Sequence, residues 1–215
     1  VQLRALTSAQ IAGLGTEDLN LLTSDQFAQL GTAQVAALTG SQLGALESAD
    51  LAALGTAQMR ALSTAAIAGL DSADLAALGS TQLAALTSDQ LRSLGSEDLA
   101  GLKTETLAGL GSAQIASLTS AQLGALGSDQ LQSLSSAQLR ALSPAQLASL
   151  GSDDLNALTT AQFQQLTSVQ IAGLTTAQVA SLESADIAAL GTAQLRGLGT
   201  AQIAGLDSAD LAALD

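Results

Sequence analysis

Apolar residues recur along the whole chain with a period of eight residues. Leucine occupies every eighth position from Leu6 to Leu214 without a gap, and another apolar residue always precedes it by three positions. We number each eight-residue unit, or octad, so that this leucine is position 8 and the other apolar residue is position 5. The consensus then reads Thr/Gly-Ser/Thr-Ala-Gln-Leu-Ala-Ala-Leu. Self-similarity at a fixed period is typical of solenoid proteins, in which each unit buries its apolar face against its neighbours.

The composition of the octad predicts one short helix in each unit. Ala, Gln and Leu favour helix, whereas strands favour β-branched and aromatic residues. Positions 5 and 8 are three residues apart, which places them on one face of a helical turn. One continuous helix is excluded, because its apolar stripe would rotate by roughly 80° with every octad. We therefore expect an all-α solenoid of helices about six residues long, each too short to be stable without its neighbours.

Positions 1 and 4 carry the signal that starts each helix. Ser or Thr at position 1 followed by Gln at position 4 is a capping box, which satisfies two backbone amides. The single proline agrees, because Pro144 follows Ser143 and is suited to the first helical residue after an N-cap. Glycine occupies position 1 in ten octads. We expect it to adopt the left-handed conformation that ends the preceding helix.

Charged residues keep to fixed positions of the octad. All 19 acidic residues lie at positions 1, 3 or 4, and five of the six basic residues lie at position 6, Lys103 being the exception. Acidic residues near the start of a helix and basic residues near its end complement the helix dipole.

The repeat predicts how the helices stack. Positions 5 and 8 should form continuous buried ladders, and the small residues at position 7 should let helices approach closely. Seven of the ten position-1 glycines share one phase of a 16-residue period, which favours two octads per superhelical turn. No linker or change of composition interrupts residues 1–215, so we expect one array of about 27 octads. Because the chain starts and stops inside an octad, we expect an excerpt of a longer array or a unit that stacks end to end.

Composition excludes several classes of function. The chain has no Cys and no His, which rules out disulfides, Cys/His zinc sites and a Ser-His-Asp triad. A net charge of −13 argues against binding to nucleic acid. Uninterrupted apolar stretches such as residues 65–70 are far shorter than the ~20 residues of a membrane-spanning helix. We expect neither an enzyme nor a membrane-inserted protein, and no catalytic, cofactor or metal site.

Some side chains still deserve a functional interpretation beside a structural one. Adjacent acidic residues could bind Ca²⁺, but we favour charge at the helix start; they lie at Glu17–Asp18, Glu97–Asp98 and Asp153–Asp154. The position-4 glutamines could form a hydrogen-bonded ladder in addition to capping. Ser and Thr at positions 1 and 2 form a hydroxyl array that could match ice or a polysaccharide, although capping and turn chemistry explain them.

The remaining candidates are expected to be structural. Phe27 and Phe163 occupy position 5, so we expect them in the core. We expect the position-6 arginines on a solvated face, occasionally pairing with acidic residues of neighbouring coils; they are Arg4, Arg60, Arg92, Arg140 and Arg196.

The pattern Leu-x-x-Leu-Thr/Gly-Thr/Ser-x-Gln resembles octapeptide arrays of large bacterial secreted or surface proteins. Two instances are Leu3, Leu6, Thr7, Ser8 and Gln10, and Ile115, Leu118, Thr119, Ser120 and Gln122. Such arrays are often labelled haemagglutinin-like or haem-utilisation proteins. The chain has no His, Cys or Tyr to ligate haem, and Met59 is its only Met. The resemblance therefore implies that any binding activity belongs to flanking domains.

These observations predict a structural function. We expect a stiff spacer, stalk or fibre element at the cell surface or outside the cell, with end-to-end or side-by-side self-association. The alternative is a repetitive surface that adheres to glycan, ice or another copy.

Overall fold

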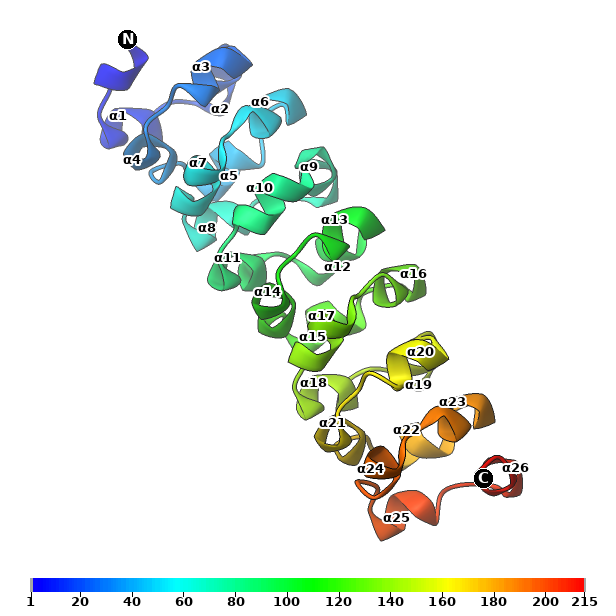
Figure 1. The fold of residues 1–215 in the computed structure, drawn as a ribbon. Coiled ribbons are helices and arrows are strands. Elements are labelled where there is room, and N and C mark those ends of the chain that lie inside the picture. Colours follow the sequence, from blue (N-terminus) through cyan, green and yellow to red (C-terminus); the bar gives the residue numbers. More distant parts are fainter. Residues whose placement is uncertain (1, 215) are drawn as a thin grey trace. The chain divides into compact units, whose positions relative to one another are not determined.

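The computed structural model describes residues 2–214, and all regular structure in that range is helical. The chain forms two compact units, Val1–Leu110 (unit 1) and Gly111–Asp215 (unit 2). This confirms the predicted solenoid of short helices, one for each octad (Figure 1).

The first element of unit 1 is a short 3₁₀ helix and the others are α-helices. They are η1 (Leu3–Ala5), α1 (Ser8–Ala12), α2 (Thr16–Leu19), α3 (Ser24–Ala28), α4 (Thr32–Val35), α5 (Gly40–Leu43), α6 (Ser48–Ala53), α7 (Thr56–Ala61), α8 (Thr64–Ile67), α9 (Ser72–Ala77), α10 (Ser80–Ala85), α11 (Ser88–Ser93), α12 (Ser96–Ala100) and α13 (Thr104–Ala108).

Unit 2 contains α-helices of the same length. They are α14 (Ser112–Ser117), α15 (Ser120–Gly124), α16 (Ser128–Gln132), α17 (Ser136–Ala141), α18 (Pro144–Ala148), α19 (Ser152–Asn156), α20 (Thr160–Phe163), α21 (Ser168–Ala172), α22 (Thr176–Ala180), α23 (Ser184–Ala189), α24 (Thr192–Leu195), α25 (Thr200–Ile203) and α26 (Ser208–Ala212).

Each α-helix begins at position 2, with position 1 as its N-cap. Pro144 is the first residue of α18 and Ser143 is its N-cap, as predicted. The prediction of a left-handed glycine is wrong, because no described residue has a positive φ. The link between helices is extended instead: Leu54 has φ −67° and ψ 127°, and Gly55 has φ −76° and ψ 164°. Two extended residues turn the chain without a left-handed residue, so position 1 only starts a helix.

The core consists of the two predicted ladders. From Ile11 to Ile187, every position-5 side chain is at most 1% exposed, and Phe27 and Phe163 are fully buried among them. From Leu30 to Leu190, every position-8 leucine is 2–6% exposed. Stacking therefore removes both apolar residues of nearly every octad from water, which supplies the stability that a single short helix lacks.

Helices pack against the helices three octads away. In unit 1, α3, α6 and α9 follow one another in contact, and in unit 2 α20, α23 and α26 do the same (Figure 1). Hydrogen bonds described below reach four octads back, so one superhelical turn takes between three and four octads. The expectation of two octads per turn is wrong. Gly, Ser and Thr all serve as N-caps at position 1, so their order along the chain does not report which octads pack together.

Small residues at position 7 permit this close packing, as predicted. A Cβ atom at Gly69 would lie 2.7 Å from the Cα atom of Gly40, which is position 2 of the octad three before. A Cβ atom at Gly197 would lie 2.8 Å from the carbonyl oxygen of Ser168, in the same relative position. The helix end of one octad therefore packs on the helix start of another.

The buried ladders predict a large difference between two leucines. Leu75 is fully buried and Leu21 is 81% exposed. We expect Leu75→Ala to lower the free energy of unfolding by about 2–5 kcal/mol, because it leaves a cavity in the core. Leu21→Ala should change it by less than about 0.5 kcal/mol. Urea denaturation followed by circular dichroism checks both, and equal effects would contradict the assignment of the core.

Candidate functional site

The glutamine at position 4 joins its own helix to a helix four octads earlier. Gly55 N–H donates to Gln58 Oε1 over 2.7 Å, so the oxygen caps the start of α7. Gln58 Nε2 donates to the carbonyl oxygens of Phe27 and Leu30, each over 2.9 Å, at the end of the octad that contains α3. The two ends of one amide therefore satisfy backbone groups of two different coils.

This arrangement, which we call the amide bridge, recurs along both units. Further glutamines that bond a carbonyl at position 5, position 8 or both, four octads earlier, are Gln34, Gln42, Gln82, Gln90, Gln146, Gln162, Gln170, Gln178, Gln194 and Gln202. The first amides and the last carbonyls of a helix have no partner within the helix. Where it occurs, the amide bridge supplies both kinds of partner.

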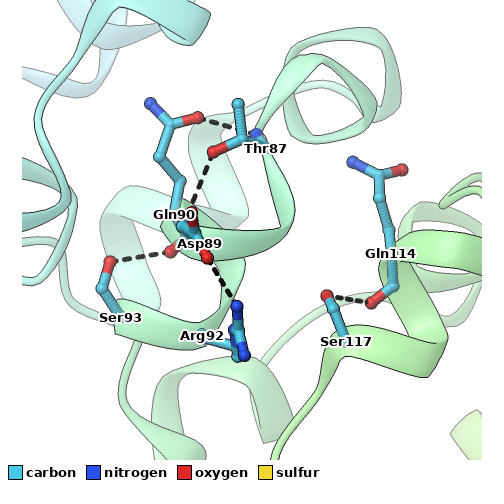
Figure 2. A network of polar contacts seen from close by, with 7 residues as sticks. All are labelled: Thr87, Asp89, Gln90, Arg92, Ser93, Gln114 and Ser117. Carbon is cyan, nitrogen blue, oxygen red and sulfur yellow. Dashed lines mark hydrogen bonds and ion pairs between the residues drawn. The ribbon is translucent and has the colours of Figure 1, made fainter.

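The predicted capping box is present beside the bridge. Figure 2 shows Gln90 with its side-chain oxygen directed at Thr87. Thr87 N–H donates to Gln90 Oε1 over 2.7 Å, and Gln90 N–H donates to Thr87 Oγ1 over 3.3 Å. Gln90 Nε2 donates to the carbonyl of Leu62 over 2.7 Å. The glutamine ladder thus exists, but its rungs run from glutamine to backbone.

Polar side chains at position 6 make a second bond between coils. Arg60 Nε donates to the carbonyl oxygen of Ala85 over 3.2 Å. Each of these side chains donates to the position-7 carbonyl three octads later. The others are Arg4, Asn20, Gln132, Arg140 and Asn156.

The arginines therefore act differently from the prediction. Arg4, Arg60 and Arg140 bond backbone carbonyls of a neighbouring coil rather than acidic side chains. Arg92 pairs with Asp89 over 2.5 Å, but this pair lies within one octad and both side chains are exposed (Figure 2). An exposed pair of this kind contributes little to stability.

The adjacent acidic pairs lie where helix-start charge would place them. They occupy the first turns of α2, α12 and α19. Among residues 2–214, no group of three or more acidic side chains is arranged to hold a metal ion. No helix in this range is long and apolar enough to cross a membrane.

The hydroxyl groups at position 1, and some of those at position 2, make hydrogen bonds inside the fold. The position-1 hydroxyl groups cap helices, as Thr87 does. At position 2, Ser8 Oγ donates to the carbonyl of Ala33 over 2.9 Å, and Ser24 Oγ donates to Asp50 Oδ1 over 2.8 Å. An open hollow of about 620 Å³ lies between coils of unit 1, lined by Thr56, Arg60, Ser80, Thr81 and four small residues. None of these lining groups forms a nucleophile–base pair.

Aspartate replaces glutamine at position 4 in seven octads, and four of these aspartates are buried. Asp50, Asp74, Asp186 and Asp210 are 3–7% exposed. Burial raises the pKa of Asp74; a hydrogen bond from the Asp71 backbone opposes this, and the charges of Asp71 and Asp98 add to it. Burial likewise raises the pKa of Asp186, opposed by a bond from the Thr160 hydroxyl.

A longer repeat of 136 residues lies over the octads. Residues 1–78 and 137–214 are identical at 52 of 78 positions, and the octad at 71–78 equals that at 207–214. The rarer residues recur at this spacing, including both asparagines and both phenylalanines.

Residues at equivalent places of the longer repeat make equivalent bonds. Asn20 donates to the carbonyl of Ala45 and Asn156 to that of Ser181, and the side-chain oxygen of each asparagine is buried without a partner among the described residues. Arg4 and Arg140 bond the carbonyls of Gln29 and Gln165 in the same way. The eight-residue period masks this longer period, which only the spacing of the rare residues marks.

Comparison with known proteins identifies a repeat family. The model of one family, described as the ALTTAQ repeat, matches residues 1–32, 43–74, 67–104, 93–128, 120–152, 147–182 and 179–215. The six letters correspond to positions 7, 8, 1, 2, 3 and 4 of the octad, and residues 157–162 read ALTTAQ in full. No curated protein matches the chain.

The amide bridge can be tested against a glutamine that only caps. Gln58 caps α7 and bonds two carbonyls, whereas the bonds of Gln10 all lie within its own octad. We expect Gln58→Ala to cost about 2–3 kcal/mol, because it leaves buried backbone groups unpaired. Gln10→Ala should cost about 1 kcal/mol, the value of a cap. Chemical denaturation measures both, and equal costs would refute a contribution from the bonds between coils.

Proposed function

Because the chain belongs to the ALTTAQ repeat family, we propose that it is a repetitive structural protein that works as a spacer, stalk or fibre element. The observation that carries this proposal is the amide bridge. The bridge recurs at many position-4 glutamines and joins coils within each unit, so that adding octads adds length without changing the local structure. Repeat number would then set the distance between whatever lies at the two ends.

The proposal includes no chemistry of the array itself. Many polar side chains cap helices or bond neighbouring coils, as Gln58 and Arg60 do. The sequence lacks the histidine and cysteine from which nucleophiles and metal sites are commonly built. Binding to glycan, haem or a surface would then fall to domains that flank the array.

We place this function outside the cell or at its surface. The support is the resemblance of the octad to arrays of large bacterial secreted or surface proteins. An acidic chain without cysteine is compatible with this location, because it needs no oxidation to fold. Fractionation of the native organism with an antibody against the array would test the placement, and recovery only from the cytoplasm would refute it.

The spacer function predicts that length follows octad number. Deleting residues 119–142, three complete octads, should shorten the maximum dimension by about 9–10 Å, the distance between packed helices. Small-angle X-ray scattering measures this change. Asp129→Ala, an exposed position-3 change inside the same segment, is the control and should leave the length unchanged. An unaltered length after the deletion would rule out a spacer.

A further inference from the structure

We propose that two buried aspartates at position 4, Asp74 and Asp186, make two segments of the array tighten in acid and loosen at neutral pH. The first segment, acid stack 1, consists of the acidic residues of the octads of α6, α9 and α12: Glu47, Asp50, Asp71, Asp74, Glu97 and Asp98. The second, acid stack 2, consists of those of α23 and α26: Glu183, Asp186, Asp207 and Asp210. This pH response goes beyond the spacer function and does not depend on it.

In the two octads that begin with aspartate, the position-4 aspartate keeps one half of the amide bridge and loses the other, whereas the N-caps Glu47 and Glu183 of the Asp50 and Asp186 octads show no capping hydrogen bond. Asp71 N–H donates to Asp74 Oδ2 over 3.1 Å, and Asp207 N–H donates to Asp210 Oδ2 over 3.2 Å, so the helix start is still capped. A glutamine would also donate to carbonyls four octads earlier, which for Asp74 are those of Leu43 and Leu46. An ionised carboxylate has no proton to donate.

The groups around Asp74 are almost all acidic. Its own octad adds Asp71, α6 adds Glu47 and Asp50, and α12 adds Glu97 and Asp98. The octad four before, at 39–46, has no charge, and the octad four after, at 103–110, contains Lys103 and Glu105. Like charges in a packed column repel each other most where burial keeps water out.

Asp186 has comparable surroundings in the second stack. Glu183 lies in its own octad, and Asp207 and Asp210 lie in the octad of α26, which packs on α23. The octad of α20, which packs on the other side, has no charged residue and contributes Thr160. The octad four before contains Asp153 and Asp154. None of the octads at 151–158, 159–166, 183–190 and 207–214 contains a basic residue.

Protonation of Asp74 and Asp186 supplies the missing hydrogen-bond donor and removes the repulsion between like charges. A neutral carboxyl group carries an O–H donor that can serve a backbone carbonyl, and it no longer repels its acidic neighbours. Burial raises the pKa of Asp74 and Asp186 above the ordinary 3.8, so the folded chain takes up these protons before the unfolded chain does. The stabilisation therefore grows as pH falls through the raised pKa, and is complete below 3.8.

Acidic residues of the stacks recur with the 136-residue repeat, so they are a regular feature of the array rather than isolated substitutions. Glu47, Asp50, Asp71 and Asp74 recur 136 residues later as Glu183, Asp186, Asp207 and Asp210. The octads of Ser24 and Ser184 supply a hydroxyl that donates over 2.8 Å to Asp50 Oδ1 and Asp210 Oδ1, respectively. These donors hold the carboxylates in the column instead of letting them turn to solvent.

Thermal unfolding of the full chain at pH 7.5 and at pH 4.5 tests the proposal. We expect the midpoint to be about 2–4 °C higher at pH 4.5. The double variant Asp74→Gln/Asp186→Gln should have a higher midpoint at pH 7.5, because each glutamine can complete an amide bridge, and it should lose at least half of the pH difference. A lower midpoint of the native chain in acid would overturn the proposal.

A matched control separates the stacks from the overall negative charge. The double variant Asp25→Asn/Asp129→Asn removes the same two charges from exposed position-3 residues. It should keep the full pH difference of the native chain. If the two double variants reduce the pH difference equally, general charge repulsion is the cause and the proposal fails.

Hydrogen exchange locates the effect within the chain. After correction for the intrinsic exchange rate, amides of α6 and α9 should gain at least fivefold more protection between pH 7.5 and pH 4.5 than amides of α16 and α17. The latter helices have Gln130 and Gln138 at position 4 and provide an internal reference. Uniform gains in all four helices would overturn the assignment to the acid stacks.

Discussion

The structure depends on one side-chain amide that reaches two coils. A helix of four to six residues leaves most of its backbone groups without partners inside the helix. The position-4 glutamine places its oxygen on an amide at the start of its own helix and its nitrogen on carbonyls at the end of another. Gln58 does both while being 7% exposed. Buried backbone polar groups are costly when unpaired, so the amide bridge is what permits such short helices to stack.

The apolar ladders stabilise the fold, and the polar network sets which octads pack together. Position 5 and position 8 side chains supply the burial that favours the folded chain, but apolar contact alone does not fix which octads meet. The amide bridge reaches back four octads, and the position-6 side chains reach forward three, as Arg60 does to Ala85. Both bonds have defined lengths and directions, so together they fix the register of the coils in each unit.

Departures from the consensus carry information because the consensus is so regular. An ionised aspartate at position 4 cannot donate to a carbonyl of an earlier coil, and five of the seven position-4 aspartates lie in the acid stacks. The stacks, the paired asparagines and the paired phenylalanines follow the 136-residue period. A purely mechanical spacer would not require such a period. The acid stacks therefore join a mechanical framework to a chemical property, the titration of buried carboxyl groups.

Signals inside the octad were enough to predict the local structure. Three-residue spacing of apolar residues, helix-favouring composition and the capping box were sufficient for a helix in every octad, because these signals act within eight residues. Pro144 after Ser143 even placed one helix start correctly. The burial of positions 5 and 8 followed from the same spacing.

How octads meet depends on contacts between residues that are far apart in the sequence. The number of octads per turn depends on distances between residues about 25 to 31 positions apart, as in the bonds of Asn20 and Gln58, and an eight-residue repeat looks the same in every such register. The extended link at Leu54 and Gly55 was misread because glycine tolerates several backbone conformations. The second bond of each glutamine was invisible for the same reason, since its acceptors are backbone carbonyls that no side-chain pattern marks.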